Sequence, residues 1–544
     1  AAVLAILGFY ASRLAMPLPL FPSDEAAYLI RAIFPDDVVL RNPFVTSVTN
    51  GVHLSVIRAA WTSGGPFIIV DRLANAAAYL GGIVVLWRAS VAGLPGRERW
   101  GLLLLALGFA YYRFAFSNLA EGLYVGLLAL ICVATGRWQR TRPWTHALAA
   151  GALCAALVLT KPHGLAVVAG LAAVALVDTA QMRDWRTLPG RALLFAAAFF
   201  AVGNLIQLGA QEPVPNPLAF FMSPFYSGAI GEHAPAGGWR PALLALQAMA
   251  GGAAVLAGPP LVIGLADLAR RWRSDRRAFR PTGRDLAFLL LAASLGATLI
   301  MATVFAWKVA ATESETRRLW GRYFEFFAPL LWLAGAPALA RPVSRGVALA
   351  SGAVVLAGLA ALLGALQRGV VLFPWDASVL TAFFAPDPAR APLHWAFPYR
   401  SAATAAALLA AGALALRLGA VRTGLALILA LSLMSAWLDY RWLAPMVSQR
   451  AALYRDIAAM RAALPPEPGT VILLTPDAND GHLGFLLLNA RPFVLLGPPS
   501  QTPPAAIADA AAVVISGPDT PPGGPWTRVY HGGDLSLWRP AGAP

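Results

Sequence analysis

The chain has 544 residues, of which 58% are hydrophobic and only 13% are charged, and its mean hydropathy is +0.63. A soluble protein of this size carries nearly twice that share of charged residues, so the composition excludes an ordinary soluble enzyme. The formal net charge is +15, and Cys132 and Cys154 both lie within apolar runs, which excludes a disulfide framework and a Cys-x-x-Cys zinc site.

Apolar stretches long enough to cross a membrane follow one another from residue 1 to about residue 440. A crossing needs ~20 mostly apolar residues, and we therefore expect about thirteen transmembrane helices. They are placed near residues 1–20, 67–87, 100–116, 121–136, 145–160, 164–178, 191–209, 241–266, 286–306, 325–340, 346–365, 401–416 and 424–440. No small-residue cleavage site precedes Phe21, so we interpret the first stretch as part of a slightly longer span rather than as a signal peptide.

The loops between these stretches alternate between two kinds, and this alternation predicts their orientation. One kind is short and rich in arginine. Its arginines are Arg88, Arg97, Arg99, Arg137, Arg140, Arg142, Arg183, Arg186, Arg191, Arg270, Arg271, Arg273, Arg276, Arg277, Arg280, Arg284, Arg341, Arg345, Arg417 and Arg422. By the positive-inside rule these loops are cytoplasmic, and they hold nearly all of the net charge of +15. The charge therefore indicates orientation and not a nucleic-acid partner.

The other loops are longer, mixed in charge and rich in aromatic residues and proline, and we expect them to face outward. They cover residues 21–66, 210–240, 307–324 and 366–400, together with tight turns at 117–120 and 161–164. With thirteen spans and an inward N-terminus, the chain after residue 440 also lies outside.

A change in composition after Tyr440 predicts an outward α/β domain of residues 441–544, separate from a membrane domain of residues 1–440. An amphipathic helix is expected over 446–464, and short apolar runs at 471–474, 493–496 and 512–515 are typical of buried strands. We also expect helices at 482–489 and 505–511 and a final hairpin at 526–538.

The first outward loop opens with an acidic pair, Asp24 and Glu25, directly after the first span. Ser23 or Asp24 can cap a helix that begins at Glu25, because their oxygens accept hydrogen bonds from free backbone amides. A carboxylate at the membrane surface is nevertheless costly without a task or a partner. The catalytic interpretation makes this pair the source of a general base.

A second acidic residue, Glu121, follows Asn118 in the turn before the fourth span, again at the outer boundary. It either caps that span or acts on the same substrate as the acidic pair. No histidine cluster with metal-ligand spacing accompanies these carboxylates, so we predict no metal site and leave the participation of a divalent cation open.

Lysine occurs twice in the chain, at Lys161 and Lys308, and both positions fall on the predicted outward side. Lys161 precedes Pro162 and His163 at a point where the helix breaks and leaves backbone groups that need partners. Either lysine could merely extend toward the water boundary. The functional interpretation is that Lys161, His163 and Lys308 bind a phosphate attached to a lipid.

Arginines and aromatic residues meet in the loop before the tenth span, where Arg318, Arg322 and Tyr323 lie close together in the sequence. A guanidinium at the water boundary suits a phosphate attached to a lipid, because it offers paired donors and a fixed charge. The alternative is an aromatic belt with an arginine anchor. These three residues are also candidates for donor binding.

Other outward residues are weaker candidates, since each is also explained as an ordinary surface residue. They are His53, Arg58, His233, His394 and Arg400. Residues 217–226 are interpreted as an interfacial segment that either lines a lipid groove or simply connects two spans. Asp477, Asp480 and His482 of the C-terminal domain are better explained as turn caps.

The acidic pair after the first span, the thirteen spans and the small outward domain together resemble the GT-C superfamily of integral-membrane glycosyltransferases. Within it the chain is most similar to the branch that holds protein O-mannosyltransferases and bacterial aminoarabinose transferases of lipid A. The resemblance includes Asp24 and Glu25, the turn at Thr160-Lys161-Pro162 and the pair Arg322-Tyr323. Many relatives carry a His-Pro-Pro-like element in the first loop, whereas His53 is not followed by prolines.

The resemblance implies transfer of a sugar from a polyprenyl-phosphate donor to a hydroxyl of a glycan, lipid or protein acceptor. It places this reaction on the periplasmic face of the bacterial inner membrane. The implied reaction is an inverting single displacement, in which a carboxylate at Asp24 takes the acceptor proton and cations offset the charge on the leaving phosphate. One acidic base is sufficient for such a reaction.

Two alternatives remain beside the transferase: a polytopic transporter or lipid flippase, and a non-catalytic envelope assembly protein. Carriers place ionisable residues near the middle of the membrane. Asp71, Arg72 and Arg113 would favour the carrier if they lined a cavity open to both sides.

Overall fold

The computed structural model of the chain describes most of the apolar region and much of the C-terminal region. The described residues are 1–14, 24–33, 50–210, 239–274, 279–308, 316–339, 342–372, 376–380, 385–386, 395–396, 406–407, 410, 429–437, 439–440, 452, 455–466, 469–475, 493–517 and 521–542. The backbone alone is described for Asp24, Lys308, Ala385, Pro386, Trp395, Ala396, Phe493 and Leu495. They form two compact units. Residues 1–13, 74–116 and 120–439 belong to the first unit, and residues 14–73, 117–119 and 440–544 belong to the second.

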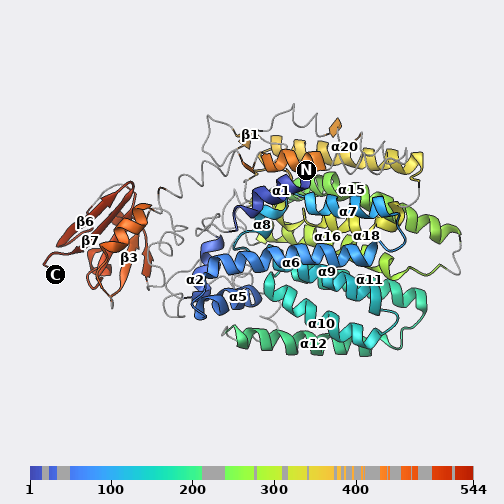
Figure 1. The fold of residues 1–544 in the computed structure, drawn as a ribbon, viewed down its shortest axis with the longest axis horizontal. Helices are drawn as coiled ribbons and strands as arrows, with labels where there is room; N and C mark the ends of the chain where they lie inside the picture. The colour runs from blue at the N-terminus through green and yellow to red at the C-terminus, as the bar shows by residue number, and fades with distance from the viewer. Residues whose placement is uncertain are drawn as a thin grey trace. The chain divides into compact units, whose positions relative to one another are not determined.

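Long apolar helices make up the first unit, and helix α6 begins in the second unit and continues into the first (Figure 1). The helices are α1 (Ala2–Ala11), α6 (Phe67–Ser90), α7 (Gly96–Gly108), α8 (Tyr112–Ala115), α9 (Glu121–Trp138), α10 (Pro143–Thr160), α11 (Gly164–Met182), α12 (Leu188–Gly209), α15 (Trp239–Ser274), α16 (Gly283–Lys308), α18 (Phe327–Ala334), α19 (Ala336–Leu339) and α20 (Arg345–Gln367). Within the described residues, eight are long and apolar enough to cross a membrane: α6, α9, α10, α11, α12, α15, α16 and α20. Their length and composition indicate a multi-pass membrane protein.

The ends of several predicted spans differ from the ends of the observed helices. The stretch 100–116 is divided between α7 and α8, and the stretch 325–340 becomes the short α18 and α19 after a 3-10 turn, η1 (Gly321–Tyr323). Helix α15 has 36 residues because it continues beyond its apolar part into the arginine-rich segment. The expected span at 401–416 lies mostly outside the described residues, and helix is described at 429–437 within the last expected span.

Glycines allow two helices of the first unit to approach closely near the start of α9. A Cβ atom at Gly122 would overlap the backbone carbonyl of Asn75 on α6, and one at Gly126 would lie 2.7 Å from the carbonyl oxygen of Ala78. The side-chain Oδ1 of Asn75 also accepts a hydrogen bond from the Leu123 N–H at 3.2 Å. Small residues at helix crossings are typical of membrane bundles. The crossing therefore holds the first turn of α9, which carries Glu121, against α6.

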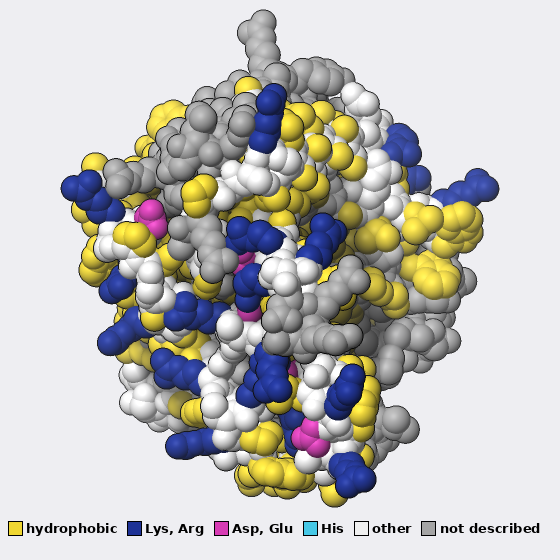
Figure 2. Space-filling model, turned by 90° about the vertical axis from the view of Figure 1, so that its right-hand side faces the viewer, with side chains coloured by type: hydrophobic (Ala, Val, Ile, Leu, Met, Phe, Trp, Pro, Cys, Tyr) yellow, Lys and Arg dark blue, Asp and Glu magenta, His cyan; other side chains and the backbone are white. Residues whose placement is uncertain are grey.

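One end of the first unit is rich in arginine and poor in acidic side chains (Figure 2). The exposed side chains of Arg88, Arg137, Arg186 and Arg273 come from loops and helix ends that the sequence predicts to be cytoplasmic. The segments predicted to face outward supply η1 and the turns at the other ends of these helices.

Among its described residues, the second unit contains two short helices before α6, a helical stretch at 455–462 and a five-stranded sheet. The helices are α2 (Asp24–Ile33) and α5 (Gly51–Thr62), and the strands in sheet order are β4 (Phe493–Leu496), β3 (Val471–Leu474), β5 (Ala512–Ser516), β7 (Leu535–Pro540) and β6 (Trp526–Gly532). Strand β3 is parallel to β4 and β5, whereas β7 is antiparallel to β5 and β6. The first unit has one more pair, β1 (Ala385–Pro386) with β2 (Trp395–Ala396).

The predicted strands and the final hairpin are confirmed, but one predicted helix is wrong. Over 505–511 the chain forms a 3-10 turn at Pro504–Ala506 and an open turn instead, because only a few residues separate this proline from the start of β5. The helix expected at 482–489 lies outside the described residues. Residues 455–462 are helical, within the amphipathic stretch expected over 446–464.

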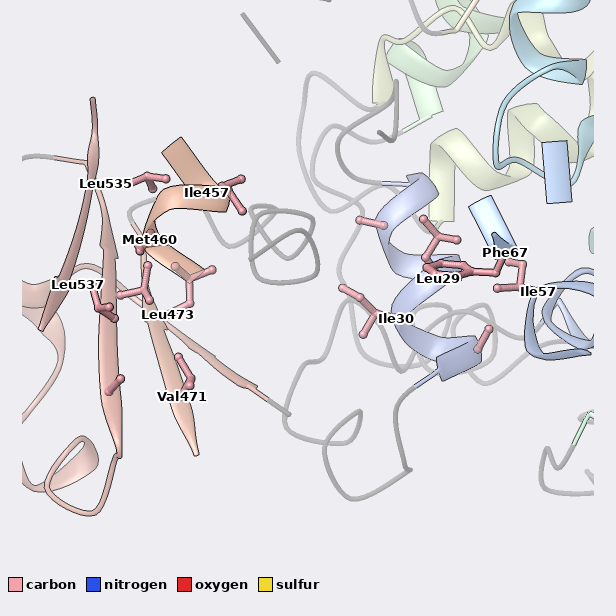
Figure 3. Close-up of a cluster of buried hydrophobic side chains, with 14 of the residues drawn as sticks. Leu29, Ile30, Ile57, Phe67, Ile457, Met460, Val471, Leu473, Leu535 and Leu537 are labelled. Atoms are coloured by element: carbon pink, nitrogen blue, oxygen red, sulfur yellow. The ribbon is translucent and has the colours of Figure 1, made fainter. Parts of the chain in front are cut away.

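Buried side chains alternate along the strands of the sheet, as the period of two requires. Val471 and Leu473 belong to one hydrophobic cluster, and Ile472 and Leu474 belong to another. The first cluster also takes side chains from α2, α5 and the start of α6 (Figure 3), among them Leu29, Ile30, Ile57 and Phe67.

Candidate active site

Glu25 is the described member of the acidic pair, and it is completely buried in the second unit. It lies in the first turn of α2, which begins at Asp24 and not at Glu25 as the capping interpretation supposed. Its Oε1 accepts a hydrogen bond from the backbone N–H of Asn118 at 2.6 Å. The acidic pair is therefore joined directly to the turn that precedes α9. The side chain of Asp24 lies outside the described residues.

The same unit buries a second carboxylate, Asp71, in the first turns of α6. Its Oδ1 lies 2.9 Å from Nε2 of His53, and its Oδ2 accepts a hydrogen bond from Nδ2 of Asn118 at 2.9 Å. The buried guanidinium of Arg72 interacts electrostatically with Glu25 and Asp71. We call Glu25, His53, Asp71, Arg72 and Asn118 the acidic cluster, and all five are completely buried.

The structure gives different surroundings to the two weaker candidates of the first loop. His53 belongs to the acidic cluster, and its ring also packs edge-on against Tyr28 with centroids 4.9 Å apart. Arg58 instead donates a hydrogen bond from Nε to the carbonyl oxygen of Ala32 at 3.0 Å. Arg58 thus ties α5 to the end of α2, a structural contact.

In the first unit, Glu121 and Lys161 form a buried ion pair. Glu121 is the first residue of α9, and Lys161 ends α10 in an extended conformation, where Pro162 prevents the helix from continuing. The Nζ of Lys161 also lies 5.2 Å from the centre of the Tyr323 ring. The helix break predicted from Pro162 and Gly164 therefore serves to place the ammonium group of Lys161 beside Glu121 and Tyr323.

An aromatic stack continues from this ion pair. The ring of His163 lies 3.9 Å from that of Tyr323, and Tyr323 is stacked on Trp320 with centroids 5.3 Å apart. Burial, and then the charges of Lys161 and Arg322, lower the pKa of His163 well below its ordinary value. The imidazole is therefore neutral at neutral pH, and it contributes an aromatic surface and a hydrogen-bonding nitrogen but no charge.

Two arginines complete this group. The guanidinium carbon of Arg322 lies 5.4 Å from the Tyr323 ring centre, and that of Arg318 lies 4.2 Å from the Trp320 ring centre. We call Glu121, Lys161, His163, Arg318, Arg322, Tyr323 and Trp320 the cationic cluster. Its three permanent cations face two carboxylates, because Glu121 pairs with Lys161 and Asp376 pairs with Arg318. The cluster therefore keeps one cation in excess, which favours an anion.

A short segment after α20 holds the two arginines in place. Asp376 accepts a hydrogen bond from Nη2 of Arg318 at 2.6 Å, and its backbone carbonyl accepts one from the N–H of Arg322. Two residues beyond η1, Glu325 accepts hydrogen bonds from the backbone N–H groups of Ser378 at 2.6 Å and Leu380 at 2.9 Å. These contacts fix η1, and with it the positions of Arg322 and Tyr323.

Five of the six predicted donor-binding residues come together in the cationic cluster. The five are Lys161, His163, Arg318, Arg322 and Tyr323. The side chain of Lys308 lies outside the described residues, as do His233, His394, Arg400, Asp477, Asp480, His482 and the segment 217–226.

Four residues in or beside the two clusters were not among the predicted site residues, namely Asp71, Arg72, Asn118 and Asp376. Asp71 and Arg72 carried a signal, since an acidic and a basic residue inside an apolar stretch are costly and mark a function or a partner. Asn118 and Asp376 carried none, because an isolated Asn or Asp in a loop is ordinary. Their importance follows from hydrogen bonds to residues 47 and 58 positions away.

The charged residues that favoured a carrier are all engaged within the protein. Asp71 pairs with His53, and Nε of Arg113 donates to Oδ2 of Asp439 at 2.9 Å. Arg113 also donates to the carbonyl oxygen of Ala377 at 2.6 Å. Asp71, Arg72 and Arg113 are 0%, 0% and 3% exposed. Asp71 and Arg113 are thus paired with protein groups, and all three side chains are buried.

Among the described residues, no group of three or more His, Cys, Asp or Glu side chains is arranged to hold a metal ion. Glu25 and Asp71 accept hydrogen bonds from Asn118, and Glu121 pairs with Lys161.

No family model and no curated protein matches the sequence. Among solved structures, the chain is similar to ArnT from Cupriavidus metallidurans in the apo state, with a TM-score of 0.53 and 19% identity over 99% of this chain and 96% of that one. It is also similar to the archaeal oligosaccharyltransferase AglB from Archaeoglobus fulgidus in complex with an inhibitory peptide and a dolichol-phosphate, with a TM-score of 0.41 and 14% identity over 94% of this chain and 69% of that one. The likeness to ArnT shows that the two chains share a fold, and it confirms the expected polytopic helical fold with a small C-terminal sheet.

Proposed function

We propose that this chain, which shares the fold of ArnT, is a glycosyltransferase that moves a sugar from a polyprenyl-phosphate carrier to an acceptor hydroxyl. The observation that carries the proposal is the cationic cluster, in which Lys161 and Arg322 lie beside the ring of Tyr323 and Arg318 lies over the stacked ring of Trp320. Lys161 and Arg322, which are far apart in the sequence, converge there on a site suited to an anion at the end of the membrane helices. The fold of a known aminoarabinose transferase supports the same conclusion.

The cationic cluster would act on the donor phosphate. In a single displacement the acceptor oxygen forms a bond to the anomeric carbon, and the bond from that carbon to the phosphate oxygen breaks. The electron pair leaves with the polyprenyl phosphate, so negative charge grows on the phosphate in the transition state. Arg322 and Lys161 stabilise this charge through charge-assisted hydrogen bonds. Tyr323 and Trp320 hold the guanidinium groups in place.

The acidic pair would act on the acceptor. Asp24 takes the proton from the acceptor hydroxyl as its oxygen attacks, the task of a general base. Glu25 is a positioning residue in this proposal, because its own carboxylate is occupied by the N–H of Asn118. Its bond holds the first turn of α2, and therefore the backbone of Asp24, at a fixed place in the second unit.

The remaining parts of the proposal concern location. We propose that the chain resides in a bacterial inner membrane, that the acidic and cationic clusters face the periplasm, and that residues 441–544 form a periplasmic domain. The asymmetric arginine loops support this orientation. Glycan, lipid and protein hydroxyls are all suitable acceptors for the chemistry.

The test uses the purified full chain in proteoliposomes with a panel of synthetic polyprenyl-phosphate sugars and a membrane extract as acceptor. The measured quantity is free polyprenyl phosphate, which forms whichever sugar is transferred. The proposal expects release with at least one sugar and its loss in Arg322→Gln. Arg345→Gln, an exposed arginine at the opposite end, is the matched control and should retain the activity. Movement of the intact donor across the bilayer without release would instead support a flippase.

A further inference from the structure

A second basic site lies at the arginine-rich end of the first unit, at the opposite end of α9 from Glu121. A cavity of about 550 Å³ opens there between the ends of α6 and α9, the arginine-rich part of α15 and the start of α16. Figure 2 shows the arginine-rich end of the first unit. Arg137 and Glu121 are separated by 16 residues of α9, or about 24 Å along a helix. The cavity is therefore distinct from the cationic cluster.

Among the described residues, three arginines line this cavity, and one of them is already paired with carboxylates. Arg271 donates from Nη1 and Nη2 to the two carboxylate oxygens of Asp285 at 2.8 and 2.6 Å, and from Nε to Asp267 at 2.9 Å. Asp285 in turn accepts a hydrogen bond from the N–H of Thr282. Both carboxylates on this side of the cavity are therefore already engaged by protein donors.

The other two arginines have no carboxylate partner among the described residues. The side chain of Arg137 is exposed at the end of α9, and Arg284 donates only to the backbone carbonyl oxygen of Ala92 at 2.8 Å. Both line the cavity together with Arg271. Since Asp267 and Asp285 are engaged by Arg271, the charge available to a ligand is that of Arg137 and Arg284.

The rest of the lining is apolar or small. Leu86, Val133, Ala287 and Pro337 contribute hydrocarbon surface, and Ser90 contributes a hydroxyl. A site that combines two guanidinium groups with hydrocarbon walls, between the ends of transmembrane helices, matches an anionic lipid better than a small soluble anion. The planar guanidinium also suits the paired oxygens of a phosphate.

We propose that this cavity binds a phosphate group carried by an anionic membrane lipid, with Arg137 and Arg284 as its ligands. This site does not depend on the proposed transfer reaction. Its role is to anchor the ends of α6, α9 and α16, which the lipid would join on the side predicted to be cytoplasmic.

The experiment measures lipid binding to the detergent-purified full chain by native mass spectrometry and by the shift of its melting temperature. The probes are phosphatidylglycerol, phosphatidylcholine and inorganic phosphate. We expect phosphatidylglycerol to bind and to raise the melting temperature, and the double variant R137Q/R284Q to bind it at least tenfold more weakly. The control R88Q/R97Q removes the same charge from the same end, outside the cavity lining, and should bind as the parent does.

The outcomes separate the alternatives. An equal loss in both double variants would mean that the lipid is attracted by the general basic rim, which overturns the site. Equal binding of phosphatidylcholine and phosphatidylglycerol would overturn the requirement for an anion. Saturation by inorganic phosphate alone, with no further effect of the lipid, would keep the phosphate site and reject the lipid as its source. If R137Q/R284Q fails to fold, R137K/R284K keeps the charge and should show an intermediate affinity.

Discussion

Lys161 and Glu121 form an ion pair across 40 positions of sequence, and both side chains are buried. The pair joins the end of α10 to the start of α9. The ion pair also affects the charge that is available to a ligand. In this arrangement Glu121 neutralises Lys161, so a phosphate that approaches Lys161 must share it with a carboxylate.

Replacement of Lys161 by Met should separate the structural role of this pair from its role in donor binding. The variant leaves Glu121 buried and unpaired, which costs on the order of 3 kcal/mol of stability. In the double variant K161M/E121Q the buried charge is gone, so most of the stability should return while donor binding stays lost. Thermal unfolding in detergent and the KM for the donor measure the two effects. A double variant that recovers both would show that Lys161 has a structural role only.

Arg322 should be sensitive even to replacement by lysine. A lysine keeps the charge but loses the planar pair of donors and the contact with Tyr323. A charge-assisted hydrogen bond contributes ~1.5–3 kcal/mol, so kcat/KM should fall about tenfold or more in Arg322→Lys and further in Arg322→Gln. Equal activity of Arg322→Lys and the parent would argue against paired hydrogen bonds to the phosphate.

Protonation of His163 should make the protein less stable in mild acid. Its pKa in the folded protein is lowered, so the neutral ring is the form that the fold favours. The stabilisation is complete above the unfolded pKa of about 6.5 and is lost as the pH falls below that value. The melting temperature should therefore drop between about pH 6.5 and 5, and His163→Phe should reduce this drop. His531→Asn, at an exposed position on β6, is the control, and an identical pH profile for all three proteins would contradict the prediction.

Gly122→Ala should loosen the crossing of α6 and α9. The added methyl group would overlap the carbonyl group of Asn75, and overpacking of this kind costs about 1–3 kcal/mol. Gly81→Ala on α6 is the matched control, because a Cβ atom there meets nothing within 4 Å. The melting temperature of the first variant should fall and that of the second should not. Equal melting temperatures would show that the crossing tolerates a larger separation.

Local patterns in the sequence predicted those parts of the site that depend on a local break or a local charge. Pro162 ends α10, and this end of the helix determines the position of Lys161. Arg322 and Tyr323 are neighbours in the sequence, so a cation and an aromatic ring stay close together however the helices pack. The same holds for strands such as 471–474, where the apolar run and its flanking turns suffice.

The partners of these residues could not be predicted, because tertiary packing alone brings them together. Asp376 reaches Arg318 only when α16, η1 and α20 have packed, and Asn118 reaches Asp71 only when α6 lies beside the turn before α9. Nothing near either residue in the sequence marks it. The partner of Glu121 could not be predicted either, because Lys161 lies 40 positions away and gives no local signal.

Asp24 is the proposed base of a transfer from a polyprenyl-phosphate sugar. The measurement is the rate of polyprenyl phosphate release by Asp24→Asn in proteoliposomes, with the melting temperature and donor binding measured on the same preparation. Loss of a general base lowers a rate by about 10²–10⁴-fold. We predict a loss of this size with unchanged melting temperature and donor binding. Release at the parent's rate by a folded Asp24→Asn variant would contradict the account.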